Sequence, residues 1–269
     1  MHKLVSDYEV INFDIPPGSF GTRVLGVNDH GDFVGFSSEP FSGFLYQKGK
    51  TSVVHVPGSS FDEVSGINNS GVIVGKYVDK ATDTSHAFIY EAEKFTTLEP
   101  PAAKSSAAYG INDRGDVVGF YQDSRGVGRG FLYTNKSFVE IDFPGVFDTR
   151  ATGINNKGQI VGFYVQPKDK RFRGFIYEKG IFTTIDYPAP DAIHTRLLGI
   201  NVAGDIVGFC LCGPQRLRGF LYRNGVFTDI QFSDGTPTFP NGINRHGVVV
   251  GFYSGSDGGH GFFAVPRKR

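Results

Sequence analysis

The segment Gly153-Ile154-Asn155-Asn156-Lys157-Gly158-Gln159-Ile160-Val161-Gly162 holds the pattern that determines the fold of this chain of 269 residues. A Gly-Ile-Asn triplet precedes a short turn that closes on glycine, and an apolar segment ending in Val-Gly follows. The triplet, with Val for Ile in its first copy, occurs six times, at intervals of 40, 44, 43, 46 and 43 residues. The copies are centred on Gly26, Gly66, Gly110, Gly153, Gly199 and Gly242. Such a period is typical of proteins that stack one small structural unit.

Each repeat predicts four short strands. The Asn-x-x-Gly turn fits a hairpin, whose last residue needs the positive φ that glycine adopts readily. Farther on lie an aromatic segment, such as Gly130-Phe131-Leu132-Tyr133, and an alternating one, such as Ile181-Phe182-Thr183-Thr184-Ile185-Asp186. A sheet that is apolar on both faces is buried when such sheets stack radially, and no stretch has helical periodicity. The sequence therefore predicts an all-β, six-bladed β-propeller, a single domain over residues 1–269.

The two ends of the chain are predicted to share one blade. Before the first inner strand, which begins near Thr22, the segment Tyr8–Pro16 already alternates like a fourth strand. At the other end, the chain stops after an aromatic strand, Phe262-Phe263-Ala264-Val265. The N-terminal strand should therefore supply the missing fourth strand of the last blade, which leaves no open blade for another chain to pair with.

Charge and composition restrict the kinds of partner and the cellular compartment that we expect. The 27 Lys and Arg residues balance 27 Asp and Glu, so net charge gives no reason to expect nucleic acid. No apolar run approaches the roughly 18 residues of a membrane helix. The start, Met1-His2-Lys3-Leu4-Val5, lacks the apolar core of a signal peptide, which predicts a cytoplasmic protein unless a leader has been removed. We expect a small-molecule ligand, no cofactor, and a monomer by default.

Cysteine and metal-ligand spacing predict neither a disulfide nor a metal site. Cys210 and Cys212 stand two apart in an expected strand, where a bridge between them would be strained. The sequence therefore predicts two thiols. No His-x-x-x-His or Cys-x-x-Cys spacing occurs, and no segment completes a calcium loop.

The second repeat contains His86-Ala87-Phe88, and most other repeats have Arg-Gly-Phe or His-Gly-Phe at the equivalent place. This motif resembles the HAF repeat of bacterial proteins. The resemblance covers about Tyr8 to Val265. It implies an extracellular or periplasmic location, whereas the start of the chain predicts the cytoplasm, and both alternatives stay open. The kelch and WD40 repeats are poorer matches, because the chain contains no Trp.

Comparison of the six copies of the innermost strand distinguishes positions that the blade requires from positions that can carry function. Two residues before the Gly of Gly-Ile-Asn every copy is apolar, which predicts packing between blades, and four before it most copies carry a hydroxyl for a structural role. The residues three and one before this Gly vary in charge and size. Because the loops that enter these strands are the longer and more variable set, we place the binding face at this end.

The variable positions predict a basic entrance on the propeller axis. Arginine binds carboxylate or phosphate through two parallel hydrogen bonds. The predicted ligand-binding residues are Arg23, Arg150, Arg196, Ser65, Thr152, Asn241 and Phe239. The predicted catalytic residues, which would transfer protons, are Glu63, His194 and Tyr109. An alternative that the sequence leaves open pairs the arginines with Asp62, Asp148 or Asp191.

Two other sets of residues are predicted to serve the repeat itself. The Asn of each triplet is expected to cap its hairpin rather than form an ion-binding ring. The residue before Gly-Phe is expected to bond nearby backbone. This second set is Arg129, Arg173 and Arg218, with His86 and His260 at matching positions.

Three functions fit these features. The first is binding of a small anionic or polar ligand, carbohydrate included, in the axial entrance. The second is an enzyme, a lyase, hydrolase or cyclase, acting there on a carboxylate-bearing small molecule. The third is a protein-interaction platform, which predicts an exposed apolar patch above a few hundred Å². The fold alone does not choose among them.

Overall fold

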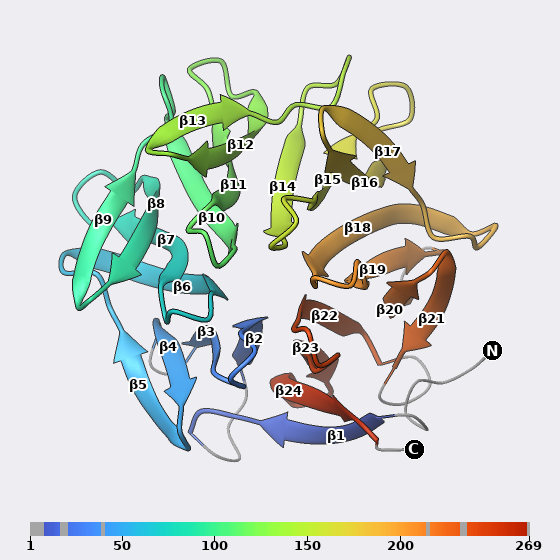
Figure 1. Ribbon diagram of the computed structural model, residues 1–269, viewed down its shortest axis with the longest axis horizontal. Coiled ribbons are helices and arrows are strands. Elements are labelled where there is room, and N and C mark those ends of the chain that lie inside the picture. The colour runs from blue at the N-terminus through green and yellow to red at the C-terminus, as the bar shows by residue number, and fades with distance from the viewer. Residues whose placement is uncertain (1–7, 17–20, 39–40, 214–215, 232–235, 268–269) are drawn as a thin grey trace.

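The computed structural model describes residues 8–16, 21–38, 41–213, 216–231 and 236–267, which form six four-stranded antiparallel sheets. The sheets stand side by side in a ring around a central axis (Figure 1). The predicted six-bladed β-propeller is therefore confirmed. The described ranges contain strands and turns without any helix, and accordingly no helix there is long and apolar enough to cross a membrane.

The four strands of each blade follow one another from the axis outward. The innermost strands are β2 (Thr22–Val27), β6 (Ser59–Ile67), β10 (Ser105–Ile111), β14 (Thr149–Ile154), β18 (Ala192–Ile200) and β22 (Thr238–Ile243). The second strands are β3 (Phe33–Ser38), β7 (Ile73–Asp79), β11 (Val117–Gln122), β15 (Ile160–Val165), β19 (Ile206–Cys212) and β23 (Val249–Gly255). The third strands are β4 (Phe41–Gln47), β8 (Ser85–Glu91), β12 (Gly128–Thr134), β16 (Phe172–Glu178), β20 (Arg216–Arg223) and β24 (Gly258–Pro266). The outer strands are β5 (Lys50–Val54), β9 (Lys94–Leu98), β13 (Ser137–Glu140), β17 (Ile181–Ile185), β21 (Val226–Ile230) and β1 (Tyr8–Phe13).

The hairpin after each innermost strand is held as its sequence predicts. In the fourth blade, Oδ1 of Asn155 accepts hydrogen bonds from the backbone N–H groups of Lys157 (3.0 Å) and Gln159 (3.1 Å). Gly158 then takes a φ of 81°, a conformation that glycine adopts without the steric cost of a side chain. The triplet asparagines are therefore hairpin caps.

The same asparagines also join neighbouring blades. Nδ2 of Asn155 donates to the backbone carbonyl of Asn201 in the next blade at 2.9 Å. Equivalent bonds connect every pair of adjacent blades, and the last runs from Asn244 back to Asn28 at 3.0 Å. Six amides thus form a closed ring of hydrogen bonds round the axis, a role that the sequence did not predict.

The core lies between the blades and inside them. The residues two before the triplet glycine are all buried, as predicted: Val24, Val64, Ala108, Ala151, Leu197 and Pro240. The hydroxyls four before it are structural, as predicted, because those of Thr22, Ser106, Thr149 and Thr195 bind the backbone that arrives from the preceding blade. Thr149, for example, accepts a hydrogen bond from the N–H of Phe143, and Thr195 accepts one from Tyr187.

The chain ends share the sixth blade. β1 pairs antiparallel with β24, from Tyr8 opposite Pro266 to Phe13 opposite Gly261, and completes the sheet β1-β24-β23-β22. Figure 1 shows the blue N-terminal strand on the outside of the red C-terminal blade. The predicted closure is confirmed.

The residue before Gly-Phe serves the blade through a carboxylate that follows the outer strand. Nη1 of Arg129 lies 2.6 Å from Oδ2 of Asp142, whose Oδ1 accepts the N–H of Gly130 at 3.0 Å. In the sixth blade His260 replaces the arginine, and its Nδ1 lies 3.1 Å from Asp14. A repeat role was predicted, although the partner in these blades is a carboxylate rather than a backbone carbonyl.

His260 is expected to make the closure of the ring sensitive to pH. Hydrogen bonds with Asp257 and Asp14 raise the pKa of His260 above its ordinary 6.5. A raised pKa in the folded state stabilises the protein below the unfolded value and loses this contribution as the pH rises through the folded value. We expect a loss of about 1 kcal/mol at alkaline pH. His260→Arg should remove this pH dependence, since arginine stays charged.

The measurement is urea unfolding at several pH values from roughly 6 to 9. Arg129 is the natural precedent for the variant, because an arginine already occupies the equivalent position of the third blade. Parallel pH profiles for the native protein and His260→Arg would show that the histidine does not titrate as inferred.

The prediction of two thiols is wrong. Cys210 and Cys212 form a disulfide with their Cα atoms 5.7 Å apart, within the usual span. A regular strand would separate them by about 6.6–6.8 Å. Here β19 lies opposite a register shift of β18 between Ala192 and His194, and this irregularity accompanies the shorter separation.

Candidate functional site

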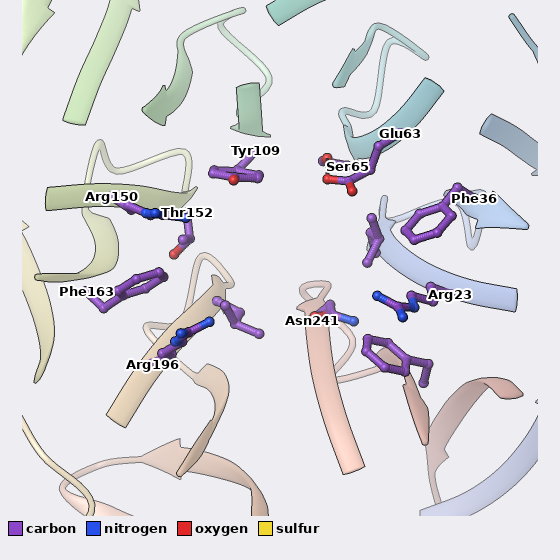
Figure 2. Close-up of a pocket in the computed structure, with 13 residues that line it drawn as sticks. Arg23, Phe36, Glu63, Ser65, Tyr109, Arg150, Thr152, Phe163, Arg196 and Asn241 are labelled. Carbon is purple, nitrogen blue, oxygen red and sulfur yellow. Dashed lines mark hydrogen bonds between the residues drawn. The ribbon is translucent and has the colours of Figure 1, made fainter. Parts of the chain in front are cut away.

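A cavity of about 220 Å³ opens on the axis, at the end of the ring where the innermost strands begin. Figure 2 shows its labelled side chains arranged around an open centre. The lining comes from all six blades and comprises Arg23, Leu25, Phe36, Glu63, Ser65, Tyr109, Arg150, Thr152, Phe163, Arg196, Leu198, Asn241 and Phe252. The binding face predicted from the variable positions therefore coincides with a cavity.

A β-bulge in every innermost strand aims one side chain at the axis. In the first blade Val24 pairs with Gly35 and Gly26 with Val34, so Leu25 is an extra residue with no partner in the register. The other five blades have the same shift. A bulge re-aims the side chain of the extra residue. All six extra residues line the cavity, and they are Leu25, Ser65, Tyr109, Thr152, Leu198 and Asn241.

The position two residues before the bulge supplies the charges. Arg23, Glu63, Arg150 and Arg196 line the cavity from this position. Each pairs across the sheet with the residue that follows Val-Gly in the second strand: Arg23 with Phe36, Glu63 with Lys76, Arg150 with Phe163 and Arg196 with Phe209. The pairing therefore places an aromatic ring beside each arginine and a lysine beside the one glutamate.

Aromatic faces support the arginines. The guanidinium carbon of Arg23 lies 5.3 Å from the centre of the Phe36 ring and 4.8 Å from that of Phe252. That of Arg196 lies 4.3 Å from Phe172 and 4.8 Å from Phe163. When a guanidinium stacks on an aromatic ring, the flat face of the guanidinium contacts the ring. The N–H donors lie in the plane of the guanidinium and point away from that contact. The stacking therefore leaves donors for a ligand.

Only one of the three predicted pairings of arginine with acid occurs in the part of the chain that the structure describes. Nε of Arg150 lies 3.3 Å from Oδ1 of Asp148. The buried Asp62 instead binds His55 at 2.6 Å. Within the described ranges, no salt bridge joins Arg23 or Arg196 to a carboxylate, so two guanidinium charges at the cavity have no protein counter-ion.

Arg196 is the least compensated of these groups. Its Nε is buried and has no hydrogen-bond partner among the described residues. Burial, and then the neighbouring charge of Arg150, lower the pKa of Arg196 from its ordinary value. Both effects disfavour the charged guanidinium, and a bound anion would relieve both.

Two further titratable side chains line the cavity, Glu63 and Tyr109. Oε2 of Glu63 lies 3.3 Å from Nζ of Lys76, and its Oε1 accepts a hydrogen bond from Ser65 at 3.4 Å. Tyr109 stacks on Phe120 with ring centres 5.9 Å apart. Burial, and then the charge of Glu63, raise the pKa of Tyr109 to about 12. Its hydroxyl therefore stays protonated and is available as a hydrogen-bond donor.

Thr152 and Asn241 direct their donors toward the scaffold. Oγ1 of Thr152 donates to the carbonyl of Leu197 at 2.7 Å. Nδ2 of Asn241 donates to the carbonyls of Val24 (3.1 Å) and Phe239 (3.2 Å). The donors that a ligand would meet in the cavity therefore come mainly from the arginines and Tyr109.

Two of the predicted site residues do not line the cavity. Nδ1 of His194 accepts a hydrogen bond from the N–H of Phe172 at 3.0 Å, and burial followed by Arg196 lowers its pKa. The His194 ring packs 4.7 Å from the ring of Phe172, which in turn supports Arg196, and it is not a group that faces the cavity. Phe239 stacks on Phe252 at 4.5 Å and so lies behind the wall that Phe252 forms.

Sequence reasoning missed the aromatic wall made by Phe36, Phe163 and Phe252. The signal was present, because Val-Gly is followed by Phe in five repeats and by Lys76 in the repeat that carries Glu63. Only the register across the sheet shows that this residue faces the charged position. Within the described ranges no group of three or more His, Cys, Asp and Glu side chains is placed to hold a metal ion.

Comparison with known proteins supports the fold. No family model matches the sequence, and no curated protein matches it. Among solved structures, the chain is similar to virginiamycin B lyase from Staphylococcus aureus, with 14% identity, a TM-score of 0.53, and 96% of this chain and 100% of that chain covered. It is similar also to the fucose-specific lectin from Aleuria aurantia, with 13% identity, a TM-score of 0.55, and 93% and 98% covered.

These neighbours share the propeller architecture, but at such low sequence identity they indicate the fold and not the function. The resemblance to the HAF repeat stays a prediction, since no family model matches.

Proposed function

We propose that this protein is a binding protein whose axial cavity holds a small anionic ligand. The observation that carries the proposal is the pair Arg23 and Arg196, which line one cavity without a carboxylate partner among the described residues. Arg23 is exposed to solvent, whereas Arg196 is partly buried, and for Arg196 a charge without a counter-charge in a partly buried place is costly. An anion that enters the cavity would supply the missing counter-charge and accept the free N–H donors.

The size and the walls of the cavity indicate a compact ligand with an apolar part. A cavity of about 150 Å³ is known to hold benzene, and this one measures about 220 Å³. Phe36, Phe163 and Phe252 give it flat apolar walls. A benzene ring with one or two carboxylates matches both the volume and the chemistry.

Binding is favoured over catalysis by the state of the titratable groups. A general base needs a pKa near the working pH and a free lone pair. Glu63 is paired with Lys76, Tyr109 has a pKa of about 12, and His194 lies outside the cavity lining. A lyase and a lectin share the propeller architecture, so the fold is compatible with either function. We therefore base the choice of binding over catalysis on the side chains of the cavity.

An interaction platform is less well supported. The large exposed apolar side chains of the described residues are mostly single residues on the outer strands of different blades. They are Ile11, Val53, Val139, Ile181 and Val226, with Phe147 and Val202 in loops. Because the outer strands are distributed round the ring (Figure 1), these residues form no continuous patch of the size that marks an interface.

Calorimetric titration with benzoate, terephthalate and inorganic phosphate at low salt tests the proposal. Arg196→Met should weaken binding by about 100-fold, because a charged hydrogen-bonding group is lost. Asp148→Asn should strengthen it severalfold, since the carboxylate charge that competes with the ligand for Arg150 is removed. Arg114→Met is the matched control, because Arg114 pairs with Asp116 outside this cavity.

The proposal fails if none of the three anions binds the native protein in the millimolar range or better. It fails also if Arg196→Met and Arg114→Met bind the anions equally well, since binding would then follow net charge and not the cavity.

A further inference from the structure

The charges of the cavity are not spread evenly round the axis. Glu63 is neutralised by Lys76, and Arg150 shares Asp148. Two positive charges therefore remain, on Arg23 of β2 and Arg196 of β18. These strands belong to the first and fifth blades, so the blade of β22 stands between them.

Figure 2 shows how the two guanidinium groups lie. Arg23 and Arg196 approach the open centre from separate sides, and Asn241 lies between their strands. Asn241 uses its two amide protons on the carbonyls of Val24 and Phe239. The wall between the two arginines therefore offers a ligand no further positively charged group. A single carboxylate that binds one of the two guanidinium groups leaves the other guanidinium without a counter-charge.

Each arginine has its own aromatic support, which keeps the two apart. Arg23 stacks on Phe36 and Phe252, whereas Arg196 stacks on Phe163, Phe172 and Phe209. The two groups of rings do not overlap. Held in this way, the guanidinium groups would have to give up cation–π contacts in order to converge on one anion.

From this separation, and resting on the proposed function, we infer that the ligand is a dianion whose two anionic groups stand apart on a flat apolar body. One anionic group binds Arg196, assisted by Arg150, and the other binds Arg23. The apolar body lies along the aromatic wall of Phe163 and Phe252. Dicarboxylates and phosphorylated carboxylates both carry two separated anionic groups, and either class could bind the two arginines in this way.

Three isomers test the inference, because they have the same charge and the same atoms. Phthalate holds its two carboxylates side by side, whereas isophthalate and terephthalate hold them apart. We expect the better of the two separated isomers to bind at least about tenfold more tightly than phthalate and than the monoanion benzoate. Equal affinity of phthalate and both separated isomers would overturn the inference.

Variants of Arg23 show whether the second anionic group binds there. Arg23→Met should lower the affinity for the preferred dianion by about tenfold more than the affinity for benzoate. Arg23→Gln, which keeps polar atoms at the site, should do the same, and Arg114→Met should leave the ratio of the two affinities unchanged. An equal loss for dianion and monoanion in both Arg23 variants would contradict the assignment.

The outcomes separate this inference from the proposed function. If benzoate and all three isomers fail to bind, the proposed function fails and the inference fails with it. If benzoate binds as tightly as every isomer, and Arg196→Met abolishes that binding, the cavity is an anion site but the inference about a dianion is wrong.

Discussion

Gly251→Ala is expected to destabilise the protein by about 3 kcal/mol or more, toward the upper end of overpacked core substitutions. A Cβ at Gly251 would lie 2.2 Å from the backbone carbonyl oxygen of Phe239 and 2.9 Å from the ring of Phe262. The first contact is with backbone, which no rotamer change relieves. The strand would have to leave its partner β22, and the bulge that aims Asn241 at the cavity would be lost with it.

Thermal unfolding measures this effect. For a chain of this size we expect a fall in Tm of about 6 °C or more. Gly259→Ala is the matched control in the neighbouring strand β24, because the nearest atom to its Cβ lies 4.0 Å away. Gly259→Ala should keep the Tm close to that of the native protein. If Gly251→Ala also unfolds within about 2 °C of the native protein, the close approach inferred for Val-Gly is wrong.

The reason for this glycine recurs in every blade. Each Val-Gly glycine pairs across the sheet with the buried Phe of Gly-Phe, for example Gly162 with Phe175. It also lies under the carbonyl of the residue three before the triplet glycine, which is 2.0 Å from the Cβ position at Gly162. Because the constraint occurs six times in one sequence, the strands and the hairpins could be predicted, whereas the closure was predicted from the patterns at the two ends of the chain.

The arginines at the axial entrance could be singled out for a related reason. Arg23, Arg150 and Arg196 differ from their counterparts in other repeats, so they could be separated from what the blade requires. Their supporting rings could not, because a Phe that faces the axis and a Phe in the core look the same in sequence. The register between first and second strands supplies that distinction, as the pairing of Arg150 with Phe163 shows.

His194 illustrates the limit of reasoning from residue type. A histidine beside an arginine in a long loop has the chemistry of a general base. Its position opposite Leu211, with Nδ1 bound to the backbone of Phe172, depends on the register shift of β18. The same shift lies opposite Leu211 and Cys212. The displaced histidine and the unexpected disulfide therefore lie at one local irregularity of the sheet, which the sequence pattern does not show.

Asn155→Ala is expected to destabilise the protein by about 2–3 kcal/mol, because four hydrogen bonds of one buried side chain are lost. Two hold the hairpin, from the N–H groups of Lys157 and Gln159. Two others are donated by Nδ2, to Gln159 and to the carbonyl of Asn201 in the next blade. Urea unfolding should show a lower midpoint, and Lys157→Ala, at an exposed position of the same turn, should stay within about 0.5 kcal/mol of the native protein.

Asn155→Asp separates the hairpin from the ring. Aspartate keeps an oxygen that can accept the two hairpin N–H bonds, but it cannot donate to the carbonyl of Asn201. If the amide ring stabilises the closed propeller, Asn155→Asp should cost at least about 1 kcal/mol, since a buried donor is replaced by an acceptor that faces a carbonyl. If Asn155→Asp is as stable as the native protein while Asn155→Ala is not, the asparagines act as hairpin caps alone. The six blades would then be held together by their packed faces and by the pairing of β1 with β24.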